Sequence, residues 1–512
     1  MASHHLAPFP PELLAAKKQI REQAKSYGLD FFPVIFEMCD YEQMNQIAAY
    51  GGFPQRYPHW RFGAEYEGLR KRHHYGLGRI YEMVINNDPC YAYLQESNQL
   101  VDQKLVIAHV YGHADFFKHN LWFGQTNRKM MDEMANHSTH VRRYIEKHGQ
   151  DAVERWLDVC LSIEDLIDPH SMFLNRGPME MRKEEPKRGD ESSGKLRSDK
   201  DYLDRWINPP SVLEAEQKKL RDDKAKMRHA TPARPTRDVL QYLLDHARLD
   251  DWQADCLSIV REEAYYFAPQ GMTKVMNEGW ASYWHSTLMT KHFVEAKEII
   301  DYADHHSGTV HMPPGNFNPY KIGLEMFRDI EDRWNKGKFG KEYDEAENLG
   351  QKKRWDKGLG QGREKIFEVR RVYNDVNFID EFMTPEFIEK HKFYQYGRDP
   401  HTGQLRIVSR DPVRIKQTML YQLTNLGRPF IYVVDGNYAN RGELYLAHKH
   451  NGLDLEIKYA VETLKNVYKV WQRPVHLQAK IDDDMILFSF AGDQPKQQTI
   501  HDELPKPAHQ VA

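Results

Sequence analysis

Apolar residues recur at helical spacing over most of the chain, and only the C-terminal part shows the short apolar runs typical of strands. This pattern predicts helices over residues 11–27, 40–50, 101–119, 129–168, 236–246, 252–267, 272–291 and 320–335. Residues 88–100 look like a short strand that leads into the helix at 101–119. The sequence Ala268-Pro269-Gln270-Gly271 predicts a turn that joins the two helices beside it into a hairpin.

The C-terminal part alternates strand and helix patterns. Strands are predicted at 405–409, 430–434, 443–447, 475–479 and 485–489, and helices at 411–426 and 454–471. This is a βαββαβ order with one extra strand, which is typical of a small ferredoxin-like domain. We therefore expect a mainly α protein with a smaller α+β, ferredoxin-like C-terminal domain.

Changes in composition divide the chain into five segments. These are a helical part at 1–175, a charged stretch at 176–235, a second helical part at 236–395, the C-terminal domain at 396–495 and a polar tail at 496–512. The charged stretch is poor in apolar side chains, so burial cannot offset the entropy of ordering it. We expect it to be an exposed, partly disordered excursion.

Composition also excludes several classes of protein. With 512 residues, 40% of them hydrophobic, the chain can bury its own core. A net charge of −4 argues against a general nucleic-acid binder, and no segment approaches the ~20 apolar residues of a membrane span. The four cysteines are far apart in sequence and read as buried thiols of a reducing compartment. Since no signal-peptide pattern is visible, we expect a cytoplasmic protein.

The predicted helix at 101–119 carries two histidines, His109 and His113, at spacing i, i+4. Two imidazoles at this spacing project from one face of a helix, so both can reach one metal ion. This is the ligand half of the His-Glu-x-x-His motif of metallohydrolases. The other half is missing, because Val110 stands where that motif has its glutamate base.

A third ligand is available on the helix at 272–291. The segment Asn277-Glu278-Gly279-Trp280-Ala281 is similar to the Asn-Glu-x-x-Ala setting of the third ligand in the metalloproteases called gluzincins, which implies a zincin-like helical body. His285 lies seven residues after Glu278, two turns along the same face. We therefore predict a metal site of His109, His113 and Glu278.

Two other ligand sets remain open at this point. His137 could replace Glu278, or the carboxylate could come from Glu262 or Glu263. The ligand types favour Zn²⁺, although a mixed set of histidine and carboxylate also suits iron or manganese.

Catalysis at such a site needs a base that valine cannot supply. Glu262, Glu263 and Asp115 are the candidates, with His285 behind them. The aromatic loop at 51–63 is a candidate substrate-facing segment, in which Arg56, His59 and Arg61 would supply positive charge.

Long stretches of the chain resemble the stage V sporulation protein R (SpoVR) family of bacteria. The resemblance rests on Phe53 to Gly63, on Val101 to Lys104 leading into Ala108 to Lys118, on Ile259 to Glu263 and on Met276 to His285. It implies that the valine of His109-Val110-Tyr111-Gly112-His113 is the family's own form. It also implies a link to spore cortex formation, a peptidoglycan process, or to stress physiology. Some relatives accompany a serine kinase of the PrkA type and a von Willebrand-like domain protein.

Two hypotheses of different classes follow. The first is a metal-dependent protein, with hydrolysis of an amide or related bond as its reaction if it is an enzyme. The second is a non-catalytic scaffold or regulator that binds the kinase.

Overall fold

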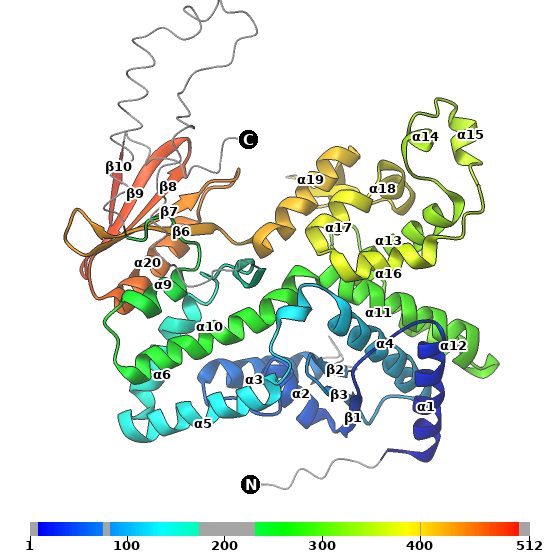
Figure 1. The fold of residues 1–512 in the computed structure, drawn as a ribbon, viewed down its shortest axis with the longest axis horizontal. Coiled ribbons are helices and arrows are strands. Elements are labelled where there is room, and N and C mark those ends of the chain that lie inside the picture. Colours follow the sequence, from blue (N-terminus) through cyan, green and yellow to red (C-terminus); the bar gives the residue numbers. More distant parts are fainter. Residues whose placement is uncertain (1–8, 75–81, 174–230, 400, 501–512) are drawn as a thin grey trace, which may run out of the picture. The chain divides into compact units, whose positions relative to one another are not determined.

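The computed structural model describes residues 9–74, 82–173, 231–399 and 401–500, so nearly all of the predicted excursion at 176–235 lies outside the described residues. The chain forms two compact units (Figure 1). Unit 1 consists of residues 1–153 and 265–427, and unit 2 of residues 154–264 and 428–512. Each unit is therefore built from two separate stretches of the chain.

Unit 1 is predominantly helical. Its helices are α1 (Pro11–Ser26), α2 (Tyr41–Ala49), α3 (Trp60–His74), α4 (Leu100–His119), α5 (Met130–His148), α11 (Lys274–Leu288), α12 (Ile299–Thr309), α13 (Pro319–Lys336), α14 (Lys341–Asp344), α15 (Leu349–Lys353), α16 (Gly362–Val372), α17 (Asp375–Phe382), α18 (Pro385–His391) and α19 (Pro412–Leu423). The predicted helix at 129–168 is interrupted at Gly149, where φ is 84°.

A three-stranded sheet precedes α4 in unit 1. Its order is β1 (Val34–Cys39), β3 (Cys90–Gln95) and β2 (Glu82–Ile85), with β3 parallel to β1 and antiparallel to β2. The strand predicted within 88–100 is β3, and it leads into α4 as expected. The sheet thus fixes where α4 begins.

Helix α11 packs directly against α4 and α13, and residues without large side chains allow the close approach (Figure 1). A Cβ atom added to Gly112 of α4 would lie 2.7 Å from the Cα of Ala281 on α11. Gly279 of α11 faces Gly323 of α13 in the same way. Trp280 and Trp284 are fully buried in the core of unit 1, so α11 is its central helix.

The start of α11 is fixed by a carboxylate from another helix. The N-cap residue Thr273 makes no side-chain cap, and instead the carboxylate of Asp375 on α17 accepts hydrogen bonds from the N–H groups of Val275 (2.8 Å) and Met276 (2.9 Å). These are N–H groups that a helix leaves without an intrahelical partner. Burial raises the pKa of Asp375 to about 7.

Unit 2 contains most of α6 (Gln150–Ser162) and α10 (Asp251–Met272), together with α9 (Val239–His246) and a five-stranded sheet. The sheet has the order β10 (Lys496–Thr499), β9 (Asp484–Phe490), β8 (Val475–Ile481), β7 (Glu443–Lys449) and β6 (Phe430–Tyr438). β7 and β8 are parallel, because α20 (Ile457–Trp471) connects them. The other neighbouring strands are antiparallel.

The structure confirms a mainly α protein with a smaller α+β C-terminal domain, but three details differ from the sequence predictions. The strand at 405–409 is β5 (Leu405–Ser409), which pairs with β4 (Gln395–Arg398) in unit 1, so the ferredoxin-like order is not formed. Residues 496–499 of the predicted tail are β10, and residues 501–512 lie outside the described residues.

The third difference is the predicted turn at 268–271. Helix α10 continues through Pro269 to Met272, and the break comes at Thr273, whose hydroxyl donates to the Pro269 carbonyl over 2.7 Å. A proline removes one hydrogen-bond donor from a helix without always ending it.

Two further sequence expectations concern whole-chain properties. The four cysteines, Cys39, Cys90, Cys160 and Cys256, are free and buried, as predicted. Within the described ranges, no helix combines the length and the apolar character that crossing a membrane requires.

Candidate metal centre

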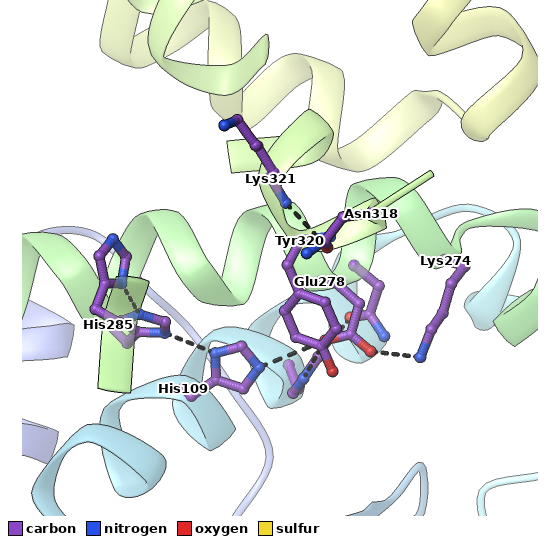
Figure 2. Close-up of polar contacts among 10 residues, drawn as sticks. His109, Lys274, Glu278, His285, Asn318, Tyr320 and Lys321 are labelled. Carbon is purple, nitrogen blue, oxygen red and sulfur yellow. Dashed lines mark hydrogen bonds and ion pairs between the residues drawn. The ribbon is translucent and has the colours of Figure 1, made fainter. Parts of the chain in front are cut away.

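Helices α4 and α11 bring His109, His113 and Glu278 together in the interior of unit 1. The Nε2 atom of His109 lies 3.5 Å from Oε2 of Glu278, and the Nε2 atom of His113 lies 3.4 Å from the same oxygen. All three residues are buried, with 3%, 6% and 6% of their surfaces exposed. Figure 2 shows the His109 ring lying between Glu278 on one side and His285 on the other.

The distances from Oε2 of Glu278 to the two histidine nitrogens match those between ligand atoms of a metal ion. A tetrahedral ion with bonds of about 2.0–2.1 Å separates its ligand atoms by about 3.3–3.4 Å. The observed separations are close to this value and longer than a good hydrogen bond. Within the described part of the chain, His109 Nε2 and Glu278 Oε2 are buried without a hydrogen-bond partner. An ion between them would satisfy both atoms.

The electrostatics of the cluster favour the protonation states that bind metals. Burial, reinforced by the neighbouring His113, lowers the pKa of His109 to about 4. Burial opposes ionisation of Glu278, but the attraction of His113, His109 and Lys274 outweighs it and holds the pKa of that carboxyl well below its usual range. A neutral imidazole and an ionised carboxylate are the forms that donate electron pairs to a metal.

Outer hydrogen bonds orient the three side chains. Asn277 Oδ1 lies 2.8 Å from Nδ1 of His113, so that nitrogen carries the proton and Nε2 keeps its lone pair. Lys274 donates to Oε1 of Glu278 over 2.6 Å, which leaves Oε2 directed toward the histidines (Figure 2). Both partners lie on the same helix as Glu278.

His109 also contacts two other aromatic rings, those of His285 and Tyr320. Nδ1 of His109 lies 2.8 Å from Nδ1 of His285, whose Nε2 lies 3.0 Å from Nδ1 of His306 on α12. The ring of Tyr320, in the first turn of α13, stacks near His109 at 6.1 Å between ring centroids. Four helices, α4, α11, α12 and α13, therefore contribute to the site.

Comparison with known proteins agrees with the motifs that form this site. Residues 10–428 match the family described as SpoVR like protein, and residues 429–482 match the SpoVR-like C-terminal domain. The chain belongs to the SpoVR family. It is also 29% identical over 496 residues to the uncharacterized protein YcgB of Escherichia coli (strain K12), covering 91% of this chain and 92% of YcgB. No solved structure matches the chain.

In this SpoVR protein, Val110 and Asp115 are both buried in the core of unit 1. Val110 is fully buried in the main hydrophobic core, on a face of α4 where a carboxylate would be desolvated. Asp115 is also fully buried, and its carboxylate accepts hydrogen bonds from the Asp30 N–H (2.8 Å) and from Nε1 of Trp280 (2.9 Å). Arg370 lies 3.4 Å from it as well. Asp115 therefore connects helices rather than facing a substrate.

The other candidate residues lie elsewhere. Glu262 is exposed and Glu263 is buried, and both lie on the part of α10 that belongs to unit 2. His137 lies on α5 and is not the third member of the His109 and His113 cluster, which takes Glu278. The catalytic assignment of Glu262, Glu263 and His285 stays a prediction.

Two of the three predicted substrate-binding residues, Arg56 and His59, lie in the loop before α3, and Arg61 lies in the first turn of α3. The buried guanidinium of Arg56 lies over the rings of Phe62 (4.8 Å) and Tyr57 (5.3 Å). Nδ1 of the buried His59 accepts from the N–H of the exposed Arg61 over 3.2 Å. Arg56 and His59 thus pack into the loop itself, and only Arg61 is exposed, so substrate binding there stays a prediction.

Four residues of the site were not predicted from the sequence: Lys274, Asn277, His306 and Tyr320. Asn277 belongs to the Asn-Glu-x-x-Ala segment, so its role could have been inferred from the motif. Lys274 is four residues before Glu278, a spacing typical of helical ion pairs. His306 and Tyr320 come from helices whose positions depend on tertiary packing, and no local signal identifies them.

Proposed function

We propose that this SpoVR protein holds one divalent metal ion, most suitably Zn²⁺, through His109, His113 and Glu278. The observation that supports this best is the meeting of two imidazole nitrogens and one carboxylate oxygen in a buried site, with the carboxylate oxygen 3.5 Å and 3.4 Å from the two nitrogens. Nitrogen and oxygen ligands of these types suit zinc. His113 and Glu278 could hold the ion while keeping their present hydrogen bonds to Asn277 and Lys274.

Hydrolysis of an amide or related bond is the reaction class that we propose for the centre. A bound zinc ion supplies a Lewis acid and lowers the pKa of a bound water. With Val110 in place of the glutamate, the proton must be accepted by another group. Glu262, Glu263 and His285 are the candidates that the sequence predicts, although both nitrogens of His285 already contact other histidines. The setting in cortex, envelope or stress physiology, and a cytoplasmic location, are expectations from the resemblance and the sequence.

One feature favours the second hypothesis, a scaffold that binds a PrkA-type kinase. Catalytic zinc sites keep a position open for water or substrate, whereas structural sites are closed. Here the cluster offers three ligands, which leaves a fourth position, but His109 Nε2 and Glu278 Oε2 have essentially no exposed surface. A closed centre would stabilise unit 1 and leave the binding of partners to its surface.

Metal analysis of the purified protein, prepared without chelator, tests the centre itself. We expect about one zinc per chain in the wild type and well below one in His113→Ala and Glu278→Gln. Glu342→Gln is the matched control, because Glu342 lies on α14, is exposed and pairs with Lys357. A metal-free wild type, or unchanged metal content in both site variants, would refute the proposal.

Cobalt substitution then separates the two hypotheses. Co²⁺ in the site gives a visible spectrum that reports its coordination. If the centre is catalytic, adding azide or acetohydroxamate should change this spectrum, because an open position takes the added ligand. An unchanged spectrum at saturating ligand would favour the closed, structural centre.

A further inference from the structure

Three histidines, His109, His285 and His306, are connected in series by hydrogen bonds that run from the core toward α12. We call this series the histidine chain. Starting from His109 on α4, the chain passes over 2.8 Å to His285 on α11 and over 3.0 Å to His306 on α12. His285 is 1% exposed, whereas His306 is only partly buried. The chain therefore links the buried cluster to a more accessible part of α12.

The atoms in this chain leave only two arrangements of its protons. A neutral imidazole has one nitrogen that donates and one that accepts. If His306 Nδ1 accepts, then His285 donates from Nε2 and accepts at Nδ1, and His109 donates from Nδ1. In the reverse arrangement, His306 donates from Nδ1, His285 donates from Nδ1, and the proton of His109 lies on Nε2.

Only the first arrangement leaves a lone pair on Nε2 of His109, the atom that faces Glu278. We infer that His285 and His306 are positioning residues for His109, and that acceptance of a hydrogen bond by His306 Nδ1 holds His109 in the tautomer that can bind a metal. This inference rests on the proposed metal centre for its consequence, but the tautomer itself can be observed without metal.

Contacts of α12 hold His306 in place. The neighbouring residue His305 pairs through Nδ1 with the buried carboxylate of Asp102 on α4. The ring of Tyr302, one turn earlier, stacks on His306 with 5.7 Å between centroids. The two consecutive histidines thus attach α12 to α4 and to α11, and the second of them continues the chain.

Three variants test the inference. His306→Leu removes the acceptor, and His306→Asn returns an acceptor oxygen close to the position of Nδ1. His119→Leu is the control, since His119 lies at the end of the same helix as His109 but pairs with Asp30. Zinc affinity is measured by competition with a chromophoric chelator, and the Co²⁺ spectrum is recorded for each protein.

We expect His306→Leu to bind zinc roughly 10–100-fold more weakly, as removal of an outer hydrogen bond does at other sites. His306→Asn should recover most of the affinity, and His119→Leu should equal the wild type. Equal affinity and an identical Co²⁺ spectrum in His306→Leu would overturn the inference. Equal losses in His306→Leu and His306→Asn would overturn it too, because they would indicate that packing of α12 matters and the acceptor does not.

A metal-free measurement separates this inference from the proposed function. Long-range ¹⁵N–¹H spectra of protein labelled at histidine should show His109 protonated at Nδ1 in the wild type. A proton on Nε2 would overturn the inference whether or not metal binds. A wild type with the expected tautomer but no zinc would refute the metal centre alone.

Discussion

At His113 the hydrogen bond to Asn277 decides which nitrogen faces His109 and Glu278. Its Nδ1 atom lies 2.8 Å from the side-chain oxygen of Asn277, so the amide fixes both the tautomer and the direction of the ring. Asn277 is 8% exposed, and water therefore cannot easily replace it as the acceptor.

Asn277→Leu should weaken metal binding roughly 10–100-fold, because His113 loses the acceptor that orients it. Asn277→Asp keeps an acceptor in the same place, so it should retain the affinity of the wild type or exceed it. Competition with a chelator measures both variants under one condition. Equal affinities in all three proteins would show that Asn277 does not orient His113.

At the residue scale, the sequence predicted the three residues that cluster, but not their surroundings. His109, His113 and Glu278 could be predicted because helical spacing and the Asn-Glu-x-x-Ala segment are local signals in the sequence. The contact between His109 and His285 was predicted only in part. Helical spacing placed His285 on the same face as Glu278, but it did not identify His109 as the residue that His285 contacts. His306 could not be predicted, because it reaches the site through the packing of α12.

At the element scale, the site depends on how closely α4 and α11 approach each other. Gly112 and Ala281 meet at the contact, and both lie within the stretches that carry the ligands. The side chains of His113 and Glu278 can meet only if the helix axes stay this near. The small residues in the two motifs thus have a packing role beside the chemical role of their neighbours.

Gly112→Ala should therefore disturb both the fold and the site. The added Cβ would lie 2.7 Å from the backbone of Ala281, which cannot move cheaply. We expect the free energy of unfolding to fall by about 1–3 kcal/mol, as in other overpacked cores. Denaturant unfolding measures this loss, and zinc affinity should fall with it.

Gly308→Ala is the matched control for this substitution. Gly308 lies on α12, and a Cβ there meets nothing within 4 Å. Alanine favours the helix over glycine by up to about 1 kcal/mol, so the variant should be at least as stable as the wild type. If Gly112→Ala were as stable as this control, the close approach of α4 and α11 would not limit the site.

Some helices and strands were predicted correctly, whereas one strand pairing and one helix end were not, and the reasons are physical. Helices α4, α11 and α13 were found because apolar residues recur at helical spacing over long stretches, although α4 and α11 are buried on nearly all sides. The strand at 405–409 was found, but its partner was not. A short apolar run shows that a strand forms and does not show which strand it pairs with. The end of α10 was misplaced because Pro269 was expected to end it.

At the scale of the whole molecule, the candidate centre belongs to only one of the two units. His109, His113 and Glu278 all lie in unit 1, whereas unit 2 has its own buried residues, such as Leu446, Val467 and Val475. A ligand that binds only the native state stabilises the part of the protein that binds it. Metal binding should therefore stabilise unit 1 specifically.

Scanning calorimetry with and without chelator tests this expectation. If free zinc is 100 times its dissociation constant, binding adds about 2.7 kcal/mol to the stability of the native state. Removing zinc should thus lower the melting temperature of the transition that includes unit 1. In Glu278→Gln the chelator should have no effect, since the variant has no bound ion to lose. A chelator effect of the same size in Glu278→Gln would place the metal elsewhere, and none in the wild type would favour a scaffold that works without a metal.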